Sequence, residues 1–505
     1  MSPEHQQGLP TGDENVRKKH GRVAVVDIGS NSVRLVVYDA PTRLPIPMYN
    51  EKAQCALGRG LGASGVLSPQ GVDCALSSIT RFAGLAEAMG VEELQLVATA
   101  AVRDAKDGPE FVQDVKDAIG RDIQVLSGED EAKYAALGLL MGVPHADGVI
   151  GDMGGGSLDL VGLNNGTFSE SDTLPFGHLR LGEASEGNPE RARDIVTDEM
   201  SKLKWLKSVK GRTLYAAGGS WRSLARILID QTSYPLHVVD NFTMDAETAL
   251  KILHLISGAG RHSLDLIPGV PKKRIETLPF AAAALEGMLR VTEASKLQFS
   301  GFGMREGVLL SCLSNELRLQ DPLIAACKTM SERMGRFSVK GREMLEWMAP
   351  LYPDETQVEM RLRYAACLMS DIGWNEHPDY RAEHSFLRVL RVPFAGLTHA
   401  ERALLATTIY VRQNGDLGDP LIRPILGLLD VGQLSWIKVT GLAMRLGHTI
   451  SGSAPGLLPQ TKLTLGKEKL TLEVMDHHRD ALISEAVRRR LKTLGRALGV
   501  KGKVV

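Results

Sequence analysis

Two short segments of the sequence combine aspartate, glycine and small polar residues in a pattern that suits phosphate binding. The first is Asp27-Ile28-Gly29-Ser30-Asn31-Ser32, and the second is Asp152-Met153-Gly154-Gly155-Gly156-Ser157. Matching residues are separated by one offset, the 125 positions between Asp27 and Asp152. Glycine and serine leave backbone N–H groups unobstructed, so these groups can converge on an anion. The repeat therefore predicts two related phosphate-binding turns.

Each turn opens with an aspartate, Asp27 or Asp152, close to the expected phosphate. A carboxylate is repelled there unless a hard cation lies between the two groups. We therefore expect Mg²⁺ or another divalent cation, with both aspartates as candidate ligands. A lone Asp-x-Gly segment is usually only a turn, and it is the repetition that favours the functional interpretation.

Apolar runs flank both turns and predict β-hairpins, which must belong to larger elements that hold them in place. Strand-like runs alternate with helical stretches such as 70–89 up to about residue 320, which indicates an α/β fold. Helical periodicity dominates afterwards, in segments such as 331–348, 357–369 and 399–412. We predict a flexible leader over 1–21, α/β domains over 22–145 and 146–320, and a mainly helical domain over 321–505.

The composition excludes several classes of protein. Hydrophobic residues make up 43% and charged residues 24% of the 505 residues, and the formal net charge is −1. These values are typical of a globular chain rather than a disordered one, a nucleic-acid coat or a membrane-surface protein. The five cysteines include no Cys-x-x-Cys pair, and no apolar run is long enough for a membrane span. We expect a cytoplasmic protein with neither nucleic acid nor membrane as a partner.

The last 45 residues are locally basic, with eleven Lys and Arg against five Asp and Glu. A solvated helix face with a frayed tail and a surface that gathers anions both explain this excess.

The paired hairpins resemble the phosphate loops of the actin, Hsp70 and sugar-kinase superfamily. This resemblance implies two ribonuclease-H-like domains with an interlobe cleft. Further motifs, in this order, are similar to the exopolyphosphatase and guanosine pentaphosphate phosphohydrolase (Ppx/GppA) family over about residues 22–310. They are Leu57-Gly58-Arg59-Gly60-Leu61-Gly62, Ala98-Thr99-Ala100-Ala101-Val102-Arg103-Asp104-Ala105, Leu126-Ser127-Gly128-Glu129-Asp130-Glu131-Ala132, Ala217-Gly218-Gly219-Ser220 and Met304-Arg305-Glu306-Gly307.

The resemblance implies two catalytic residues. Glu131 matches the family's glutamate that activates the attacking water, although an acid here also suits the start of a helix. The residues alone do not choose among Glu129, Asp130 and Glu131. Arg103 matches an arginine directed at the phosphoryl group, and its structural alternative is an ion pair with Asp104 or Asp107.

The expected substrate-binding residues are Ser30, Asn31, Ser32, Arg34, Gly154, Gly155, Gly156, Ser157, Gly219 and Ser220. We also predict that Ser220 caps the helix that follows it. The family usually has glutamate two residues after the position of Ser157, whereas this chain has Asp159, which we count as a third candidate metal ligand.

In the third domain, Met369-Ser370-Asp371-Ile372-Gly373 resembles the core of helical His-Asp (HD) phosphohydrolases, with Ser370 in place of the histidine. A degenerate domain without an active site is expected. We predict that the nearby His377, His384 and His399 are solvated or packed rather than metal ligands. Relatives of this kind are commonly dimers, which implies a homodimer.

The favoured function is that of an exopolyphosphatase, which releases orthophosphate from the end of inorganic polyphosphate. The nearest alternative is a 5′-phosphohydrolase of guanosine pentaphosphate (pppGpp), or an enzyme with both activities. An ATP-dependent kinase on the shared fold and a sensor of polyphosphate or alarmone without turnover are the other hypotheses.

Overall fold

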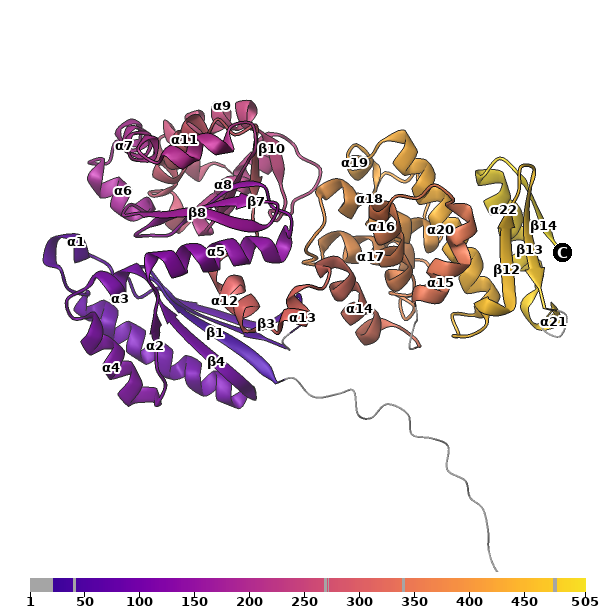
Figure 1. Ribbon diagram of the computed structural model, residues 1–505, viewed down its shortest axis with the longest axis horizontal. Helices are drawn as coiled ribbons and strands as arrows, with labels where there is room; N and C mark the ends of the chain where they lie inside the picture. Colours follow the sequence, from indigo (N-terminus) through magenta and orange to yellow (C-terminus); the bar gives the residue numbers. More distant parts are fainter. Residues whose placement is uncertain (1–20, 40–41, 268–269, 271, 338–340, 476–478) are drawn as a thin grey trace, which may run out of the picture. The chain divides into compact units, whose positions relative to one another are not determined.

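In a computed structural model, the chain divides after Ser127 into two compact units, each of which is described by itself (Figure 1). The structure describes residues 21–39, 42–267, 270, 272–337, 341–475 and 479–505. All but the last residue of the predicted 1–21 leader lie outside the described residues.

The first unit is built on a five-stranded sheet in the order β3-β2-β1-β4-β5, in which β1 pairs antiparallel with β2 and parallel with β4. Helices α2 and α4 pack against each other, and α2 covers one face of the sheet. Its elements are β1 (Arg22–Ile28), β2 (Val33–Tyr38), β3 (Pro47–Ala53), α1 (Leu61–Ser64), α2 (Pro69–Ala88), β4 (Val91–Ala98), α3 (Ala100–Asp104), α4 (Gly108–Ile119) and β5 (Gln124–Val125).

The second unit begins with α5 and a six-stranded sheet in the order β10-β11-β9-β6-β7-β8. Here β6 pairs antiparallel with β7 and parallel with β9. The elements are α5 (Gly128–Gly142), β6 (Gly148–Met153), β7 (Leu158–Asn164), β8 (Thr167–Leu174), α6 (His178–Ala184), α7 (Pro189–Ser201), β9 (Thr213–Ala217), α8 (Gly219–Gln231), β10 (Thr243–Asp245), α9 (Ala246–Ser257), α10 (Arg261–Asp265), α11 (Leu278–Thr292), β11 (Lys296–Phe299), α12 (Met304–Cys312) and α13 (Asn315–Arg318).

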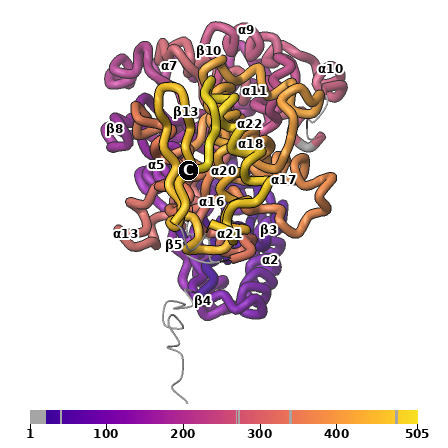
Figure 2. Tube along the Cα trace, turned by 90° about the vertical axis from the view of Figure 1, so that its right-hand side faces the viewer, coloured from indigo at the N-terminus to yellow at the C-terminus, as the bar shows by residue number. Residues whose placement is uncertain are grey.

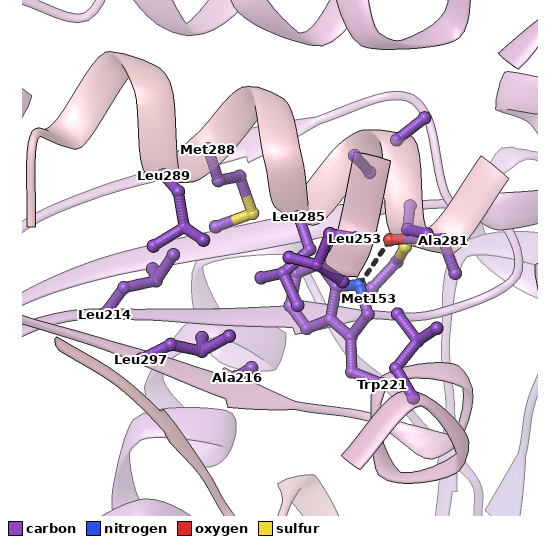
Figure 3. Packing of buried hydrophobic residues seen from close by; sticks show 14 of the residues in the cluster. Met153, Leu214, Ala216, Trp221, Leu253, Ala281, Leu285, Met288, Leu289 and Leu297 are labelled. Carbon is purple, nitrogen blue, oxygen red and sulfur yellow. Dashed lines mark hydrogen bonds between the residues drawn. The ribbon is translucent and has the colours of Figure 1, made fainter. Parts of the chain in front are cut away.

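Alternate residues of this sheet enter two different cores, as the two-residue period of a strand requires. Leu214 and Ala216 of β9 pack with α7, α8, α9 and α11, while their neighbours Tyr215 and Ala217 pack with α5 on the opposite face. On the first face, Trp221 of α8 is fully buried and donates from Nε1 to the Ala281 carbonyl of α11 at 2.9 Å (Figure 3). The sheet is thus enclosed by helices on both sides.

The rest of the second unit is mainly helical and ends in a small sheet of order β12-β13-β14 (Figure 2). Helix α22 packs against both α20 and strand β14. The elements are α14 (Pro322–Met334), α15 (Gly341–Met348), α16 (Gln357–Met369), α17 (Arg381–Arg391), α18 (His399–Arg412), α19 (Arg423–Leu426), α20 (Val431–Ser451), β12 (Thr461–Leu465), β13 (Lys469–Val474), α21 (Arg479–Leu482), α22 (Glu485–Ala497) and β14 (Lys501–Val504).

Most of the predicted elements are confirmed, including helices 357–369 and 399–412. The single helix predicted over 331–348 is wrong, because α14 ends at Met334 and Gly335 adopts an extended conformation. The C-terminal sheet is a feature that the sequence analysis did not predict. Among the described residues, no helix combines the length and apolar character that crossing a bilayer demands.

Candidate functional site

The two hairpin tips have the same hydrogen-bond pattern. The Gly29 amide donates to the Ser32 carbonyl at 3.0 Å, and the Gly154 amide donates to the Ser157 carbonyl at the same distance. The flanking strands are in register up to the tips, with Ile28 opposite Val33 and Met153 opposite Leu158. The repeat in the sequence is therefore a repeat of structure.

Neighbouring backbone fixes the carbonyls of the first tip. The carbonyls of Ser30 and Asn31 accept from the amides of Gly58 and Ala56 at 2.8 and 3.1 Å. In a trans peptide the C=O and N–H groups point in opposite directions. The amides of Asn31 and Ser32 are consequently directed away from this support, as two adjacent donors.

The second tip follows the same principle with a different support. The carbonyls of Gly154 and Gly155 accept from the amides of His178 and Leu179, at 3.2 and 3.1 Å. A Cβ on Gly177 would lie 2.4 Å from the Gly154 oxygen, so the support requires glycine there. The amides of Gly155 and Gly156 are directed away from it. Each tip therefore presents a pair of N–H groups suited to an anion.

Asp152 and Asp159 lie directly opposite each other in the β6–β7 pair, which places both side chains on one face of the sheet. Asp152 alternates with Ile150, and Asp159 with Val161, and both apolar residues belong to the core formed with α5. The two carboxylates therefore share the face that is covered by α5, the helix that carries Glu131 in its first turn.

Hydroxyl groups hold the Asp159 carboxylate. Thr173 Oγ1 donates to Oδ1 at 2.8 Å and Ser157 Oγ to Oδ2 at 3.4 Å, and Asp159 is only 6% exposed. A Cβ on Gly128 would lie 2.8 Å from Thr173 Oγ1, so the start of α5 packs closely on this threonine. Thr173 thus connects Asp159 to the helix turn that contains Glu131.

Two glycine motifs surround the Asp152 carboxylate. A Cβ on Gly218 would lie 2.8 Å from Oδ1, and one on Gly303 would lie 3.8 Å from Oδ2. Gly218 also has a φ of +103°, which side-chain-bearing residues rarely adopt. The Ala217-Gly218-Gly219-Ser220 motif and Gly303, the residue before the Met304-Arg305-Glu306-Gly307 motif, are therefore brought together at Asp152.

Glu131 is 7% exposed and lies in the first turn of α5 with Glu129 and Asp130. Helix α12 packs on α5 at glycines, since a Cβ on Gly307 would lie 1.8 Å from the Tyr134 carbonyl and one on Gly138 would lie 2.1 Å from the Gly303 carbonyl. Glu306 Oε2 accepts from the Gly303 amide at 2.9 Å and so caps α12. The Met304-Arg305-Glu306-Gly307 motif thereby helps to position the helix of Glu131.

Arg103 lies in α3 of the first unit. Its Nη1 donates to the Leu126 carbonyl at 3.0 Å, and its Nε donates to Asp104 Oδ1 at 3.1 Å. Of the two predicted ion pairs, the one with Asp104 forms, whereas Asp107 accepts from the Leu67 amide. Gly58 lies between Ser30 and Ala101, so α3 and the first hairpin tip are neighbours.

The predicted helix cap at Ser220 is wrong. Helix α8 starts at Gly219 and its N-cap is Gly218, which leaves the Ser220 side chain available for other contacts. Ser220 Oγ lies 3.4 Å from His178 Nδ1 and accepts from Arg274 Nη1 at 3.4 Å. His178 Nδ1 is also 2.7 Å from the Gly154 carbonyl, which can only accept. Ser220 is therefore joined to the second tip.

Positive charge gathers at this end of the second unit. Burial lowers the pKa of Arg274, and the nearby charges of Arg222 and Arg226 lower it further. The pKa of Arg222 is lowered by burial and by Arg305. An anion bound at the Gly219–Ser220 turn would reduce this mutual repulsion.

The carboxylates near the second tip suit a cation that takes some of its ligands from the protein and the others from phosphate and water. No group of three or more His, Cys, Asp or Glu side chains within the described part of the chain could hold a metal ion. Mg²⁺ commonly uses one or two carboxylates together with phosphate oxygens and water. Asp152 and Asp159 fit that requirement. Asp27 has Arg34 as its cross-strand neighbour in the first unit.

The sequence analysis missed His178, Thr173 and Arg274. No pattern distinguishes Arg274, because it lies in a short 3-10 helix, Lys272–Arg274, and reaches Ser220 only through the tertiary fold. The sequence does not distinguish Thr173 from other threonines in strands, because its role depends on its position opposite Asp159 in the sheet.

The HD-like segment has no histidine in Ser370's place, but Ser370 Oγ lies 2.8 Å from His448 Nε2. Asp371 is bound by Arg336. His399 is packed and 4% exposed, and His384 pairs with Glu376 near the surface, as expected of structural histidines.

Two family models match this chain, one over its α/β region and one over its mainly helical C-terminal region. The model described as the Ppx/GppA phosphatase family matches residues 36–316, and that described as exopolyphosphatase, C-terminal, matches residues 323–505. Exopolyphosphatase 1 of Mycobacterium tuberculosis is 29% identical over 310 residues, which cover 58% of this chain and 89% of the relative. Retrograde regulation protein 2 of Saccharomyces cerevisiae is 24% identical over 449 residues, covering 78% of this chain and 73% of the relative.

Solved structures are similar over the α/β region. A Ppx/GppA family member from Aquifex aeolicus is 25% identical with a TM-score of 0.50, covering 57% of this chain and 96% of that one. An exopolyphosphatase from Cytophaga hutchinsonii is 21% identical with a TM-score of 0.52, covering 57% of this chain and 97% of that one, and this likeness concerns the fold alone.

Proposed function

The chain belongs to the Ppx/GppA phosphatase family, and on that premise we propose that it is an exopolyphosphatase, which hydrolyses the terminal phosphoanhydride bond of inorganic polyphosphate. The observation that carries the proposal is the arrangement of the second unit. Two tip amides, a pair of aspartates and the first turn of the Glu131 helix are associated with one face of one sheet.

The chain's own residues supply binding and proton transfer. The tip amides donate to phosphate oxygens, and Arg103 supplies a guanidinium, whose planar fork matches phosphate better than a lysine does. Glu131 accepts a proton from the attacking water, which contributes about 10² to 10⁴ in rate. The bond between the terminal phosphorus and its bridging oxygen breaks, and orthophosphate leaves. Most of the catalysis is positioning and charge stabilisation.

A divalent cation, Mg²⁺ in the first instance, would be held by Asp152 and Asp159, with Asp27 as the third candidate. When bound, it offsets negative charge on the phosphate oxygens. Asp159 is already oriented by Thr173 and Ser157, so its carboxylate needs little rearrangement for this role. The cytoplasmic location and the homodimer stay predictions from the sequence.

The test is a comparison of substrates. Purified full-length protein with Mg²⁺ receives long polyphosphate, tripolyphosphate, pppGpp or ATP separately, and released orthophosphate is measured. We expect the highest kcat/KM with polyphosphate. Faster release from pppGpp would instead assign the alternative 5′-phosphohydrolase activity, and transfer of phosphate from ATP to an acceptor would indicate a kinase.

A further inference from the structure

A cavity suited to anions lies far along the chain from the hairpin tips, between α20 and α22. Its volume is about 100 Å³, and its lining consists of Leu442, Arg445, Arg489, Arg490 and Thr493. A water molecule needs about 10 to 15 Å³ on this measure, so there is space for a ligand several times larger.

Within the described part of the chain, no carboxylate neutralises the positive charge of this cavity. Among the described residues, no carboxylate lies within 4 Å of a side-chain nitrogen of Arg445, Arg489 or Arg490. The nearby Arg412 lies 3.7 Å from the Asp371 carboxylate, which Arg336 also binds, and its Nη1 donates to the neutral Gln413 Oε1 at 3.1 Å. Among the residues that the structure describes, these five guanidinium groups therefore have one carboxylate partner, Asp371.

These arginines also interact with one another electrostatically. Burial lowers the pKa of Arg445, and the charges of Arg490 and Arg489 lower it further. Burial and Arg489 do the same to the pKa of Arg490. Burial lowers the pKa of Arg412 to about 10, Asp371 partly compensates, and the charges of Arg490 and Arg445 lower it further. The repulsion between these neighbouring positive charges opposes folding unless a counterion binds.

Helix packing keeps the arginines close together despite their mutual repulsion. The apolar side of α22, formed by Val487, Leu491 and Leu494, is buried, and it fixes the helix against its neighbours. Arg490 Nη1 donates to the Arg445 carbonyl at 3.4 Å, which joins the two helices at the cavity. The arginine cluster is thus held by the packing of the helices rather than by ion pairs.

We propose that this cavity binds a phosphoryl group, either as free orthophosphate or as the end of a phosphate chain. Three guanidinium groups match the charge and the several acceptor oxygens of such a group. The lining contains no aromatic side chain on which a nucleobase could stack. Thr493 Oγ1 already donates to the Arg489 carbonyl, so the guanidinium groups are the available donors.

The experiment uses the full chain in buffer with EDTA and with ionic strength held constant by chloride. Binding of sodium orthophosphate and of tripolyphosphate is measured by calorimetry, and the melting temperature is recorded with and without each anion. Arg489→Gln and the double variant R445Q/R490Q test the cavity. Arg488→Gln is the matched control, since Arg488 is an exposed neighbour on the same helix that does not line the cavity.

We expect Arg489→Gln to bind orthophosphate or tripolyphosphate at least tenfold more weakly than wild type, and R445Q/R490Q to lose binding at the cavity. Arg488→Gln should bind both anions as wild type does. The exposed Arg489 tolerates substitution, so its result stands even if the double variant is unstable. EDTA removes the divalent cation that the hairpin tips require, so this result does not depend on the fate of the proposed function. Tighter binding of tripolyphosphate identifies the end of a chain as the ligand, and equal or tighter binding of orthophosphate identifies the free ion. Wild-type binding of both anions by all variants would overturn the proposal.

Discussion

Asp152 and Asp159 face each other across the β6–β7 hairpin, whereas the same two positions of the first hairpin hold Asp27 and Arg34. The two hairpins therefore share the backbone conformation of the tip but differ in the charges of the side chains beside it. One hairpin pairs a carboxylate with a guanidinium, and the other has two carboxylates on one face. In the second unit a bound cation would offset that negative charge.

Asp159→Asn should raise the Mg²⁺ concentration for half-maximal phosphate release at least tenfold. Asparagine keeps an oxygen that can accept from Thr173, so the change removes mainly the charge. Thr173→Val is the control, because it removes the hydroxyl and leaves the carboxylate, and its effect should be smaller. Unchanged Mg²⁺ dependence in Asp159→Asn would remove Asp159 from the metal site.

Gly218→Ala should reduce phosphate release at least tenfold and destabilise the fold by about 1 to 3 kcal/mol. The added methyl group would lie 2.6 Å from the Met153 carbonyl oxygen and 2.8 Å from Asp152 Oδ1, and the φ of +103° adds strain. Gly211→Ala separates the two effects, because Gly211 also has a positive φ of +76° but nothing within 4 Å of the new Cβ. Equal activity in the two variants would contradict a role of Gly218 in placing Asp152.

Arg103→Lys should lower kcat by about 10² to 10³, because lysine keeps the charge but cannot present two parallel donors to phosphate. The melting temperature should change little. Asp104→Asn breaks the ion pair seen in the structure and should leave kcat within a few fold of wild type. If the two substitutions had the same effect on kcat, Arg103 would act through its ion pair with Asp104 and not by binding phosphate.

The contacts of His399, at the start of α18, with the segment between α8 and β10 predict opposite pH effects on stability. Burial raises the pKa of Asp240 to about 6, and burial lowers the pKa of His399 to about 4. His399 Nε2 donates to the Asp240 carbonyl at 2.9 Å, and the Tyr234 hydroxyl lies 3.1 Å from its Nδ1. Each pKa unit corresponds to about 1.4 kcal/mol.

The folded state favours protonated Asp240, so this contribution to stability is present below pH 4 and is lost as the pH rises to about 6. It also favours neutral His399, whose contribution is present above about pH 6.5 and is lost as the pH falls to about 4. The two trends oppose each other in the wild type. Between pH 4 and 6.5, the melting temperature relative to wild type should rise with pH in Asp240→Asn and fall with pH in His399→Gln. Parallel profiles for all three proteins would contradict these shifts.

The sequence was informative where chemistry requires a fixed local spacing. The tips, the strands beside them and helices such as 399–412 follow from residue types and periodicity, and the start of α18 is reinforced by the cap between Thr398 and Glu401. The break at Gly335 was missed, because an isolated glycine inside a helical pattern does not by itself end a helix. The incorrect cap at Ser220 arose because serine usually caps a helix, whereas here Gly218 adopts a conformation that only glycine accepts readily.

Contacts between distant segments were beyond local patterns. Arg274 lies in a 3-10 helix that precedes α11 and reaches Ser220 across 54 positions of sequence. The link from Thr173 to Asp159 depends on strand register. The functional assignment of Glu131 over Glu129 and Asp130 came from resemblance. The structure adds that Glu131 is buried, while Glu129 and Asp130 are more exposed members of the same turn.

That difference in burial allows Glu131 to be tested as the base against its two acidic neighbours. Phosphate release from long polyphosphate with Mg²⁺ is measured for wild type, Glu131→Gln, Glu129→Gln and Asp130→Asn, with melting temperatures as the check on folding. We predict that Glu131→Gln lowers kcat at least a hundredfold with little change in melting temperature, and that the two neighbouring substitutions stay within tenfold of wild type. Release by Glu131→Gln at the wild-type rate would show that Glu131 does not activate the attacking water.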